Sequence, residues 1–400
     1  MHDVTSMVLR HEGWRSRCIN LIASENVTSQ AVRTILASDL GHRYSLQDSI
    51  AKGNFYMGTR YIDEILEYGS RVAKKLFDAE YADLRPTSGH ACAIAALMSL
   101  TQKDDSIMSL SLENGGYPGY MQDYLPDRLN LCVHEIPFDF DRLQVNIEEC
   151  VERIYIVKPK VVVIAPSMIT FATPLYKIAR ACKTVGSKLV YDGSHVLGLI
   201  AGRVFPNSLQ EGVDMLLGST HKSFPGPQGG IILSNDKHST ISKYIPLRVV
   251  DNPHFNRIAA LVLAMEEMLS FGKQYAKQTV SNARELAKAL DDNGVEVLGK
   301  KHGYTKTHQV LLKPFDGAKD FIKRLEKANI IVDTALRLGT CEVTRKGMKE
   351  QEMRHIAELV AQIYNVRDMK YFKTRILKVR KEVEELALRY SRIVFTFDAL

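Results

Sequence analysis

The sequence lacks the patterns by which metal sites, disulfide frameworks and membrane spans are usually recognised. Its six cysteines are scattered singly, with no CxxC motif and no Cys/His spacing that suits zinc. Apolar runs are no longer than a strand, and the N-terminal segment is polar and charged. We therefore expect no metal, no membrane partner and no signal peptide, and unpaired thiols of this kind indicate a reducing, cytoplasmic location.

The chain also has only a small excess of charge of one sign. The 400 residues carry 53 basic and 46 acidic side chains, and the net charge of +7 is spread along the chain. One basic run, KYFKTRILKVRK at residues 370–381, is more typical of a solvated helix face than of a binding arm. Nucleic acid is therefore not expected as a partner. A chain of this length with 45% hydrophobic residues can build two domains around an enclosed site.

What the sequence does contain is an alternation of short apolar runs with helical patterns. Strand-like runs at residues 161–166, 188–192 and 214–219 are separated by helical or loop segments, which predicts an α/β fold with a largely parallel sheet. Ligands bind beyond the carboxyl ends of such strands. A polar cluster follows each run directly: Ser167 after the first, Asp192 and His195 after the second, and Thr220, His221 and Lys222 after the third.

A second, smaller α/β region follows the sheet. A long amphipathic pattern over residues 257–290 leads into the alternating segments HQVLLKP, FIKRLEKANIIV and LRLGT. The pattern predicts an N-terminal arm at residues 1–20, a large domain at residues 21–250, and a linking helix with a small C-terminal domain at residues 251–400.

The segment GSTHKSFPGPQGG, from Gly218 to Gly230, places a lysine in a rigid, glycine-rich loop. A partly desolvated lysine forms a Schiff base with a carbonyl compound, whereas a lone loop lysine ordinarily only adds surface charge; His221 beside it would help. Asp192 follows an apolar strand, where a buried carboxylate needs a cation such as a protonated pyridine nitrogen, although a turn or cap role is the simpler alternative. Together, Lys222 and Asp192 are typical of a pyridoxal phosphate site.

Other segments supply the remaining parts of such a site. Ser88 and Gly89 open an alanine-rich helical pattern whose free amide hydrogens favour a phosphate, although they also suit simple capping. Tyr117 offers an aromatic face for the cofactor ring. Ser167 and His195 are candidates to hydrogen-bond the phenolic oxygen of the cofactor. Arg337 offers a planar fork for a substrate carboxylate, or for a neighbouring acid.

These blocks resemble the serine hydroxymethyltransferase family of fold type I pyridoxal phosphate enzymes. The resemblance rests on LIASENVTS, YADLRPTSG, VYDGSHVLGL, GSTHKSFPGPQGG and LRLGTCEVTRKGM, which together cover most of the chain. It implies a large domain with a mainly parallel sheet of seven strands, a smaller C-terminal α/β domain, an amino-acid substrate, and a homodimer with shared active sites.

The resemblance also implies a role for individual residues. By this resemblance Lys222 carries the cofactor and Tyr56 is an active-site tyrosine. His221, from its place beside the lysine, and Asp48, as a substitute for an acid that the chain lacks, complete the expected catalytic set. The cofactor-binding set is Ser88, Gly89, His90, Tyr117, Ser167, Asp192, His195, Thr220, Lys222 and, reaching the neighbouring subunit, Tyr44. The substrate carboxylate is implied to bind Ser24 and Arg337. Tyr117 stands where the family has a ring-stacking histidine.

The chain also departs from the family. Leu46 stands where the family has a proton-handling glutamate, Gln228 replaces an arginine, and VVDNPHF replaces a glycine-rich loop. Asp333, Thr334 and Ala335 replace a loop of a dozen or more residues that helps to bind folate. We therefore expect aldol cleavage and formation of 3-hydroxy amino acids without folate, and His90, Tyr56 and Asp48 are candidate bases. The alternatives are a hydroxymethyltransferase that uses tetrahydrofolate or a modified pterin, and a catalytically degenerate homologue.

Overall fold

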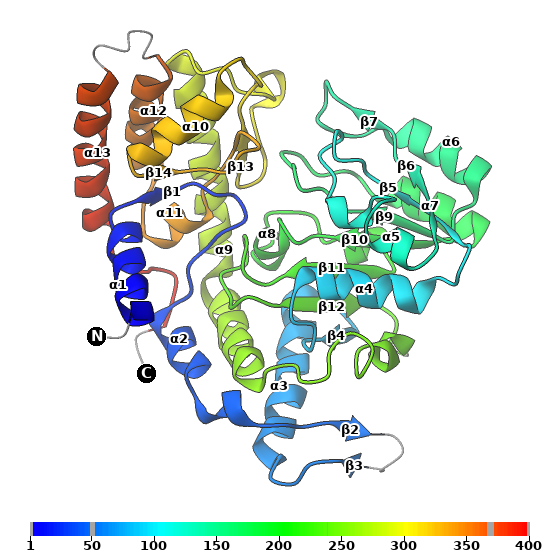
Figure 1. Ribbon diagram of the computed structural model, residues 1–400. Coiled ribbons are helices and arrows are strands. Elements are labelled where there is room, and N and C mark those ends of the chain that lie inside the picture. The colour runs from blue at the N-terminus through cyan, green and yellow to red at the C-terminus, as the bar shows by residue number, and fades with distance from the viewer. Residues whose placement is uncertain (1–2, 49–52, 238, 366–371, 398–400) are drawn as a thin grey trace. The chain divides into compact units, whose positions relative to one another are not determined.

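The computed structural model describes residues 3–48, 53–237, 239–365 and 372–397 (Figure 1). Contacts divide the chain into two compact units. Unit 1 comprises Met1–Val27 and Lys277–Phe395, and unit 2 comprises Thr28–Ala276 and Thr396–Leu400. The division made from the sequence, into an arm at residues 1–20, a large domain at residues 21–250 and a small domain at residues 251–400, remains a prediction.

Unit 2 is built on one sheet of seven strands. Their order is β4 (Tyr81–Asp83), β12 (Gly230–Ser234), β11 (Met215–Ser219), β10 (Lys188–Asp192), β9 (Val161–Ile164), β5 (Ser106–Ser109) and β6 (Cys132–Glu135). Strand β12 runs antiparallel to both of its neighbours, and the other pairs are parallel. The prediction of a mainly parallel sheet of seven strands is confirmed. The predicted runs at residues 161–166, 188–192 and 214–219 form β9, β10 and β11.

Helices cover both faces of this sheet, and its central strand β9 is accordingly apolar and buried along its whole length. Helix α4 packs across β11 and β12 (Figure 1), and its Ala93 and Ala96 belong to the same buried cluster as Leu217 and Ile232. The helices of unit 2 include α2 (Gln30–Leu36), α3 (Arg60–Phe77), α4 (Gly89–Leu100), α5 (Leu125–Arg128), α6 (Ile147–Val157), α7 (Tyr176–Val185) and α8 (Leu197–Ala201).

Two short hairpins belong to unit 2. Strands β2 (Gln47–Asp48) and β3 (Gly53–Asn54) form an arm that projects at the bottom of Figure 1, beyond the start of α3. Strands β7 (Phe138–Asp139) and β8 (Gln144–Val145) form the other hairpin, ahead of α6. Asp48 lies in the arm of β2 and β3, and Tyr44 and Tyr56 flank it in the sequence.

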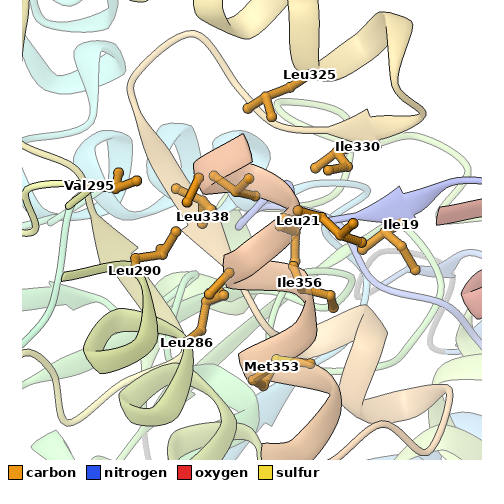
Figure 2. Close-up of a cluster of buried hydrophobic side chains, with 14 of the residues drawn as sticks. Ile19, Leu21, Leu286, Leu290, Val295, Leu325, Ile330, Leu338, Met353 and Ile356 are labelled. Atoms are coloured by element: carbon orange, nitrogen blue, oxygen red, sulfur yellow. The ribbon is translucent and has the colours of Figure 1, made fainter. Parts of the chain in front are cut away.

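Unit 1 has its own core. Strand β1 (Ile19–Asn20) pairs with β14 (Ile330–Ile331), and β13 (Gln309–Leu311) pairs with β15 (Arg337–Gly339). Figure 2 shows apolar side chains of β1, β14, β15 and α12 converging, among them Ile19, Leu338 and Ile356. The helices of unit 1 are α1 (Asp3–Arg15), α10 (Ala318–Lys327), α11 (Cys341–Arg345), α12 (Glu350–Tyr364) and α13 (Phe372–Arg389). The amphipathic pattern at residues 257–290 lies within helix α9 (Phe255–Asp292), whose residues are divided between unit 2 and unit 1.

Two features of the structure bear on membrane and metal partners. Within the described residues, no helix has the length and apolarity that a membrane crossing requires. The same part of the chain holds no group of three or more histidine, cysteine, aspartate or glutamate side chains that could bind a metal ion.

Candidate functional site

The carboxyl ends of β9, β10 and β11 border a hollow of about 60 Å³ in unit 2. Because parallel strands end at the same edge of a sheet, the polar clusters that follow these three strands come together there. The lining residues are Gly89, His90, Tyr117, Ala165, Pro166, Ser167, Asp192, Ser194, His195, Ser219 and Lys222. Most of the cofactor-binding residues predicted from the sequence are in this set.

Lys222 lies in the loop that joins β11 to the antiparallel strand β12. The loop is fixed at its base, since the Thr220 amide donates to the Gly229 carbonyl at 3.0 Å. The Thr220 hydroxyl donates to the Pro227 carbonyl at 2.7 Å, so this predicted residue braces the loop and does not line the hollow. The half-buried Lys222 amine is therefore carried on a braced segment and lines the hollow.

His221, beside the lysine, is electrostatically distinctive. Burial lowers the pKa of His221 to about 4, and the positive charge of Lys222 contributes in the same direction. The Gly229 amide donates to Nδ1 at 3.4 Å, which fits a neutral ring. His221 is thus uncharged near neutral pH and lies outside the lining of the hollow.

Asp192 ends strand β10 and is 6% exposed. The Ser194 hydroxyl and amide donate to Oδ1 at 2.5 and 3.1 Å, and the Tyr120 hydroxyl donates to Oδ2 at 3.3 Å. Burial raises the pKa of Tyr120 well above its ordinary value, and the charge of Asp192 adds to the effect. Asp192 therefore both shapes the turn after β10 and presents a buried acid to the hollow.

The start of helix α4 forms another wall. Ser88 is the N-cap and accepts a bond from the Ala91 amide at 3.0 Å. A side chain at Gly89 would collide with the Ser219 hydroxyl, which itself donates to Ser194 Oγ at 3.1 Å. Glycine is thus required here, because the helix amides and two serine hydroxyls meet in one small cradle, the kind of environment that favours a phosphate.

Tyr117 supplies the aromatic wall. Its amide donates to the Ala165 carbonyl at 2.9 Å, which ties it to the end of β9. Its hydroxyl bonds with His90 Nδ1 at 3.2 Å, and its ring packs edge-on against Tyr120, with centroids 5.9 Å apart. Burial raises the pKa of Tyr117, with a smaller contribution from the charge of Asp192.

Three predicted residues lie on the projecting arm, away from the hollow of their own chain. Tyr44 is 50% exposed and Tyr56 is 37% exposed, and their ring centroids are 5.4 Å apart. Neither lines the hollow. The backbone of Asp48 belongs to β2, and its side chain lies outside the described part of the structure.

Ser24 and Arg337, the predicted carboxylate ligands, belong to unit 1. Ile22 bridges to Leu338, and the Gly339 amide donates to the Leu21 carbonyl at 2.7 Å, so the segment that leads to Ser24 runs beside β15. The Arg337 guanidinium forms an ion pair with Asp333, with Nη2 at 2.9 Å from Oδ2.

Sequence reasoning missed Ser194, Ser219 and Tyr120. Ser219 was masked by the polar run after it, although it is the last residue of β11. Ser194 lies two residues beyond Asp192, a spacing typical of a turn in which a carboxylate accepts from the chain ahead of it. Tyr120 had no local signal, because its contact with Asp192 joins positions 72 residues apart.

The residues of the hollow fit pyridoxal phosphate. Lys222 offers an amine for the aldehyde, Asp192 an anion for the pyridine nitrogen, and Tyr117 an aromatic wall. The cradle at Gly89 leaves no room for a side chain but presents free helix amides to a phosphate. The donor set is thus that of a pyridoxal phosphate site and contains no metal-binding cluster among the described residues.

Comparisons with known proteins agree with this chemistry. The model of the family described as serine hydroxymethyltransferase matches residues 2–360. The chain is 38% identical to serine hydroxymethyltransferase of Methanothermobacter thermautotrophicus over 99% of this chain and 95% of the relative. It is also 38% identical to the protein of that name from Pyrococcus furiosus, over 99% and 96%. The crystal structure of L-threonine transaldolase from Pseudomonas fluorescens superposes with a TM-score of 0.90 at 26% identity, covering 99% of this chain and 93% of that one.

Proposed function

The chain belongs to the serine hydroxymethyltransferase family, and from this premise we propose that it cleaves and forms 3-hydroxy amino acids, with glycine as product or acceptor, without a folate carrier. A broader assignment follows directly from the family match and from the similarity to the transaldolase. The protein is a pyridoxal phosphate-dependent enzyme of the hydroxymethyltransferase or aldolase type with the fold type I architecture, and it acts on an amino acid.

One observation carries the proposal. Lys222, Asp192, Tyr117 and the start of α4 border a single hollow, although they come from four separate segments of the chain. A degenerate homologue would have no reason to keep a braced lysine, a buried acid and a side-chain-free cradle together. We therefore place the degenerate reading last.

Each residue of the hollow has a task in this proposal. Pyridoxal phosphate, when bound, supplies an electron sink for the bond that breaks at the α-carbon. Lys222 would hold the cofactor through its amine, Asp192 would pair with the ring nitrogen, and Ser88 with Gly89 would bind the phosphate. Ser167 and His195 would bond the phenolic oxygen of the cofactor. The walls also exclude water from the reacting carbon.

The substrate's own groups need partners as well. From the family we infer that Ser24 and Arg337 hold its carboxylate, since a guanidinium offers a planar fork for that group. A base must take the proton of the substrate hydroxyl. Of the candidates His90, Tyr56 and Asp48, we favour His90, because it lines the hollow and Tyr117 orients its ring through a bond at 3.2 Å.

Folate independence is inferred from two departures from the family, one at Leu46 and one at Asp333 to Ala335. Leu46, which stands at the family's glutamate position, is half-buried against a separate cavity of about 270 Å³ that also contacts Asp83 and Phe255. Its side chain cannot carry a proton. The short turn at Asp333 to Ala335 also stands where the family has the longer loop that helps to bind folate.

A second candidate function is favoured by the comparisons. The archaeal relatives at 38% identity are named serine hydroxymethyltransferase over nearly their whole length. On this alternative, serine turnover would depend on tetrahydrofolate or on a modified pterin bound by walls other than those just described.

We also propose a homodimer in the cytoplasm, with neither nucleic acid nor membrane as a partner. The exposed aromatic residues of the arm support the dimer. Tyr44 and Tyr56 are exposed and lie outside the hollow of their own chain. They are therefore available to the hollow of a neighbouring subunit. On this proposal each active site borrows side chains from both copies.

The test is an absorbance titration of the purified protein loaded with pyridoxal phosphate. We expect glycine to change the cofactor spectrum, and serine or threonine to be cleaved at the same rate with and without added pterin. Turnover that requires a pterin would establish the second candidate instead. A protein that binds no cofactor, or that is silent with every 3-hydroxy amino acid, would overturn the proposal.

A further inference from the structure

The carboxylate ligand Arg337 already holds a carboxylate from its own chain. Oδ2 of Asp333 lies 3.0 Å from Nε and 2.9 Å from Nη2 of Arg337. Both side chains are largely enclosed, with 19% and 11% of their surface exposed. This contact is better shielded from water than an ordinary surface ion pair, and shielding strengthens it.

The backbone fixes Asp333 in this position. Its other oxygen, Oδ1, accepts from the Ala335 amide at 3.0 Å and from the Arg337 amide at 3.4 Å. Leu336, between them, takes the left-handed conformation with φ of 56°, which closes the turn. The Leu336 carbonyl then accepts from the Leu312 amide at 2.9 Å, which anchors the turn to the strand beside it. Asp333 is therefore held before any ligand arrives.

Arg337 is equally well fixed. It begins β15 and pairs in register with Leu311 of β13. A guanidinium that is immobilised by its strand and an acid that is immobilised by a turn behave as a preformed pair. A second carboxylate that comes to the same guanidinium must compete with the first, and the intramolecular one has the advantage of a high effective concentration.

We propose that Asp333 is a specificity-determining residue that competes with the substrate carboxylate for Arg337. This inference rests on the proposed function, in which Arg337 binds the carboxylate of an amino acid. Asp333 weakens the binding of amino acids through their carboxylate and leaves the binding of amines that lack one unaffected. The enzyme therefore requires contacts with the rest of the substrate, beyond the α-carboxylate, for tight binding.

The experiment compares the cofactor-loaded protein with the variant Asp333→Asn. The asparagine keeps the oxygen that accepts from the Ala335 amide, so the turn is retained while the negative charge is removed. Glycine is titrated against the cofactor absorbance, and glycinamide, which has no carboxylate, is titrated in parallel. We expect the variant to bind glycine about tenfold more tightly, as loss of a competing charged partner predicts, with glycinamide unchanged.

A matched variant controls for general effects of charge. Asp292 forms an exposed ion pair with Lys288 in unit 1, also four residues apart, and Asp292→Asn should leave both titrations as in the parent. Weaker or unchanged glycine binding in Asp333→Asn would overturn the competition, and weaker binding would identify Asp333 as a positioning residue. Tightening of glycinamide as well would also overturn it. If glycine leaves the spectrum unchanged in parent and variant alike, the proposed function fails together with this inference.

Discussion

Tyr120 and Asp192 meet inside unit 2, where the tyrosine hydroxyl donates to Oδ2 of the aspartate at 3.3 Å. The tyrosine belongs to the short helical turn Pro118–Tyr120, and the aspartate ends the central strand β10. The contact thus joins the acid of the hollow to a tyrosine that packs against Tyr117, the aromatic wall.

Substituting each partner of this contact in turn separates the role of the acid from the role of its tyrosine donor. Asp192→Asn should lower turnover by about 10²-fold or more, because a neutral amide cannot hold the ring nitrogen protonated. Tyr120→Phe removes only one donor and should cost less than about tenfold. Steady-state turnover and the cofactor spectrum measure both changes. Equal losses in the two variants would show that Asp192 acts mainly through the fold.

Lys222→Arg keeps the positive charge but cannot condense with an aldehyde. We expect turnover to fall by about 10³-fold or more, and the cofactor to be lost on gel filtration. The exposed Lys183 provides a control, since Lys183→Arg should leave both measurements unchanged. Retention of the cofactor by the Lys222 variant with near-normal turnover would contradict the assigned role.

Gly89→Ala tests the phosphate cradle. The added methyl group would collide with the Ser219 hydroxyl, and overpacking of this kind costs about 1–3 kcal/mol. We expect the affinity for pyridoxal phosphate to fall about tenfold or more, measured by fluorescence titration. The double variant Gly89→Ala with Ser219→Ala should recover part of the affinity. An unaffected single variant would place the phosphate elsewhere.

The stability of unit 2 should depend on pH through His221. Its folded pKa of about 4 lies below the ordinary value of 6.5, so the unfolded chain binds the extra proton first as the pH falls. The contribution is fully present above pH 6.5 and is lost between 6.5 and about 4. This difference of about 2.5 units corresponds to about 3 kcal/mol. Urea unfolding of the parent and of His221→Gln should show a shallower pH dependence in the variant, and identical slopes would rule His221 out.

The ion pair of Asp83 and Arg85 provides a test of electrostatic stabilisation outside the lining of the hollow. Burial alone would raise the pKa of Asp83, but the charge and hydrogen bonds of Arg85 hold it below its ordinary value. Asp83→Asn leaves the guanidinium without its counter-charge and should cost about 3 kcal/mol in unfolding free energy. The exposed pair of Asp127 and Arg128 provides the control, where Asp127→Asn should change stability by less than about 0.5 kcal/mol. Similar costs for the two variants would contradict the argument.

Much of the hollow could be predicted because parallel strands end at one edge. The apolar runs locate β9, β10 and β11, and the polar residues behind them then converge by geometry alone. The same reasoning could not find Tyr120, whose contact depends on how a distant turn folds back over the sheet.

The sequence left open that Arg337 pairs with a neighbouring acid, but it did not identify that acid as Asp333. The sequence shows an acid four residues before a base, a spacing that usually signals a helix pair. Here the two residues lie on a turn and a strand, and they meet because Leu336 adopts a left-handed backbone. Propensity gives no warning of a leucine in that conformation.

Strand β12 runs antiparallel to its neighbours, and Ser219 pairs with Gly230, so the lysine loop leaves the sheet and returns to it at adjacent points. Between these anchors the loop is packed into the interior, where Ser223 and Phe224 are 0% and 1% exposed. The Ser223 hydroxyl accepts from the Gly198 amide at 3.0 Å, and the Ser223 carbonyl accepts from the Tyr275 hydroxyl at 2.8 Å. A loop of different length grafted between the same two anchors would have to replace these contacts, so the reach of the reactive amine is set jointly by the loop and by the helices behind it.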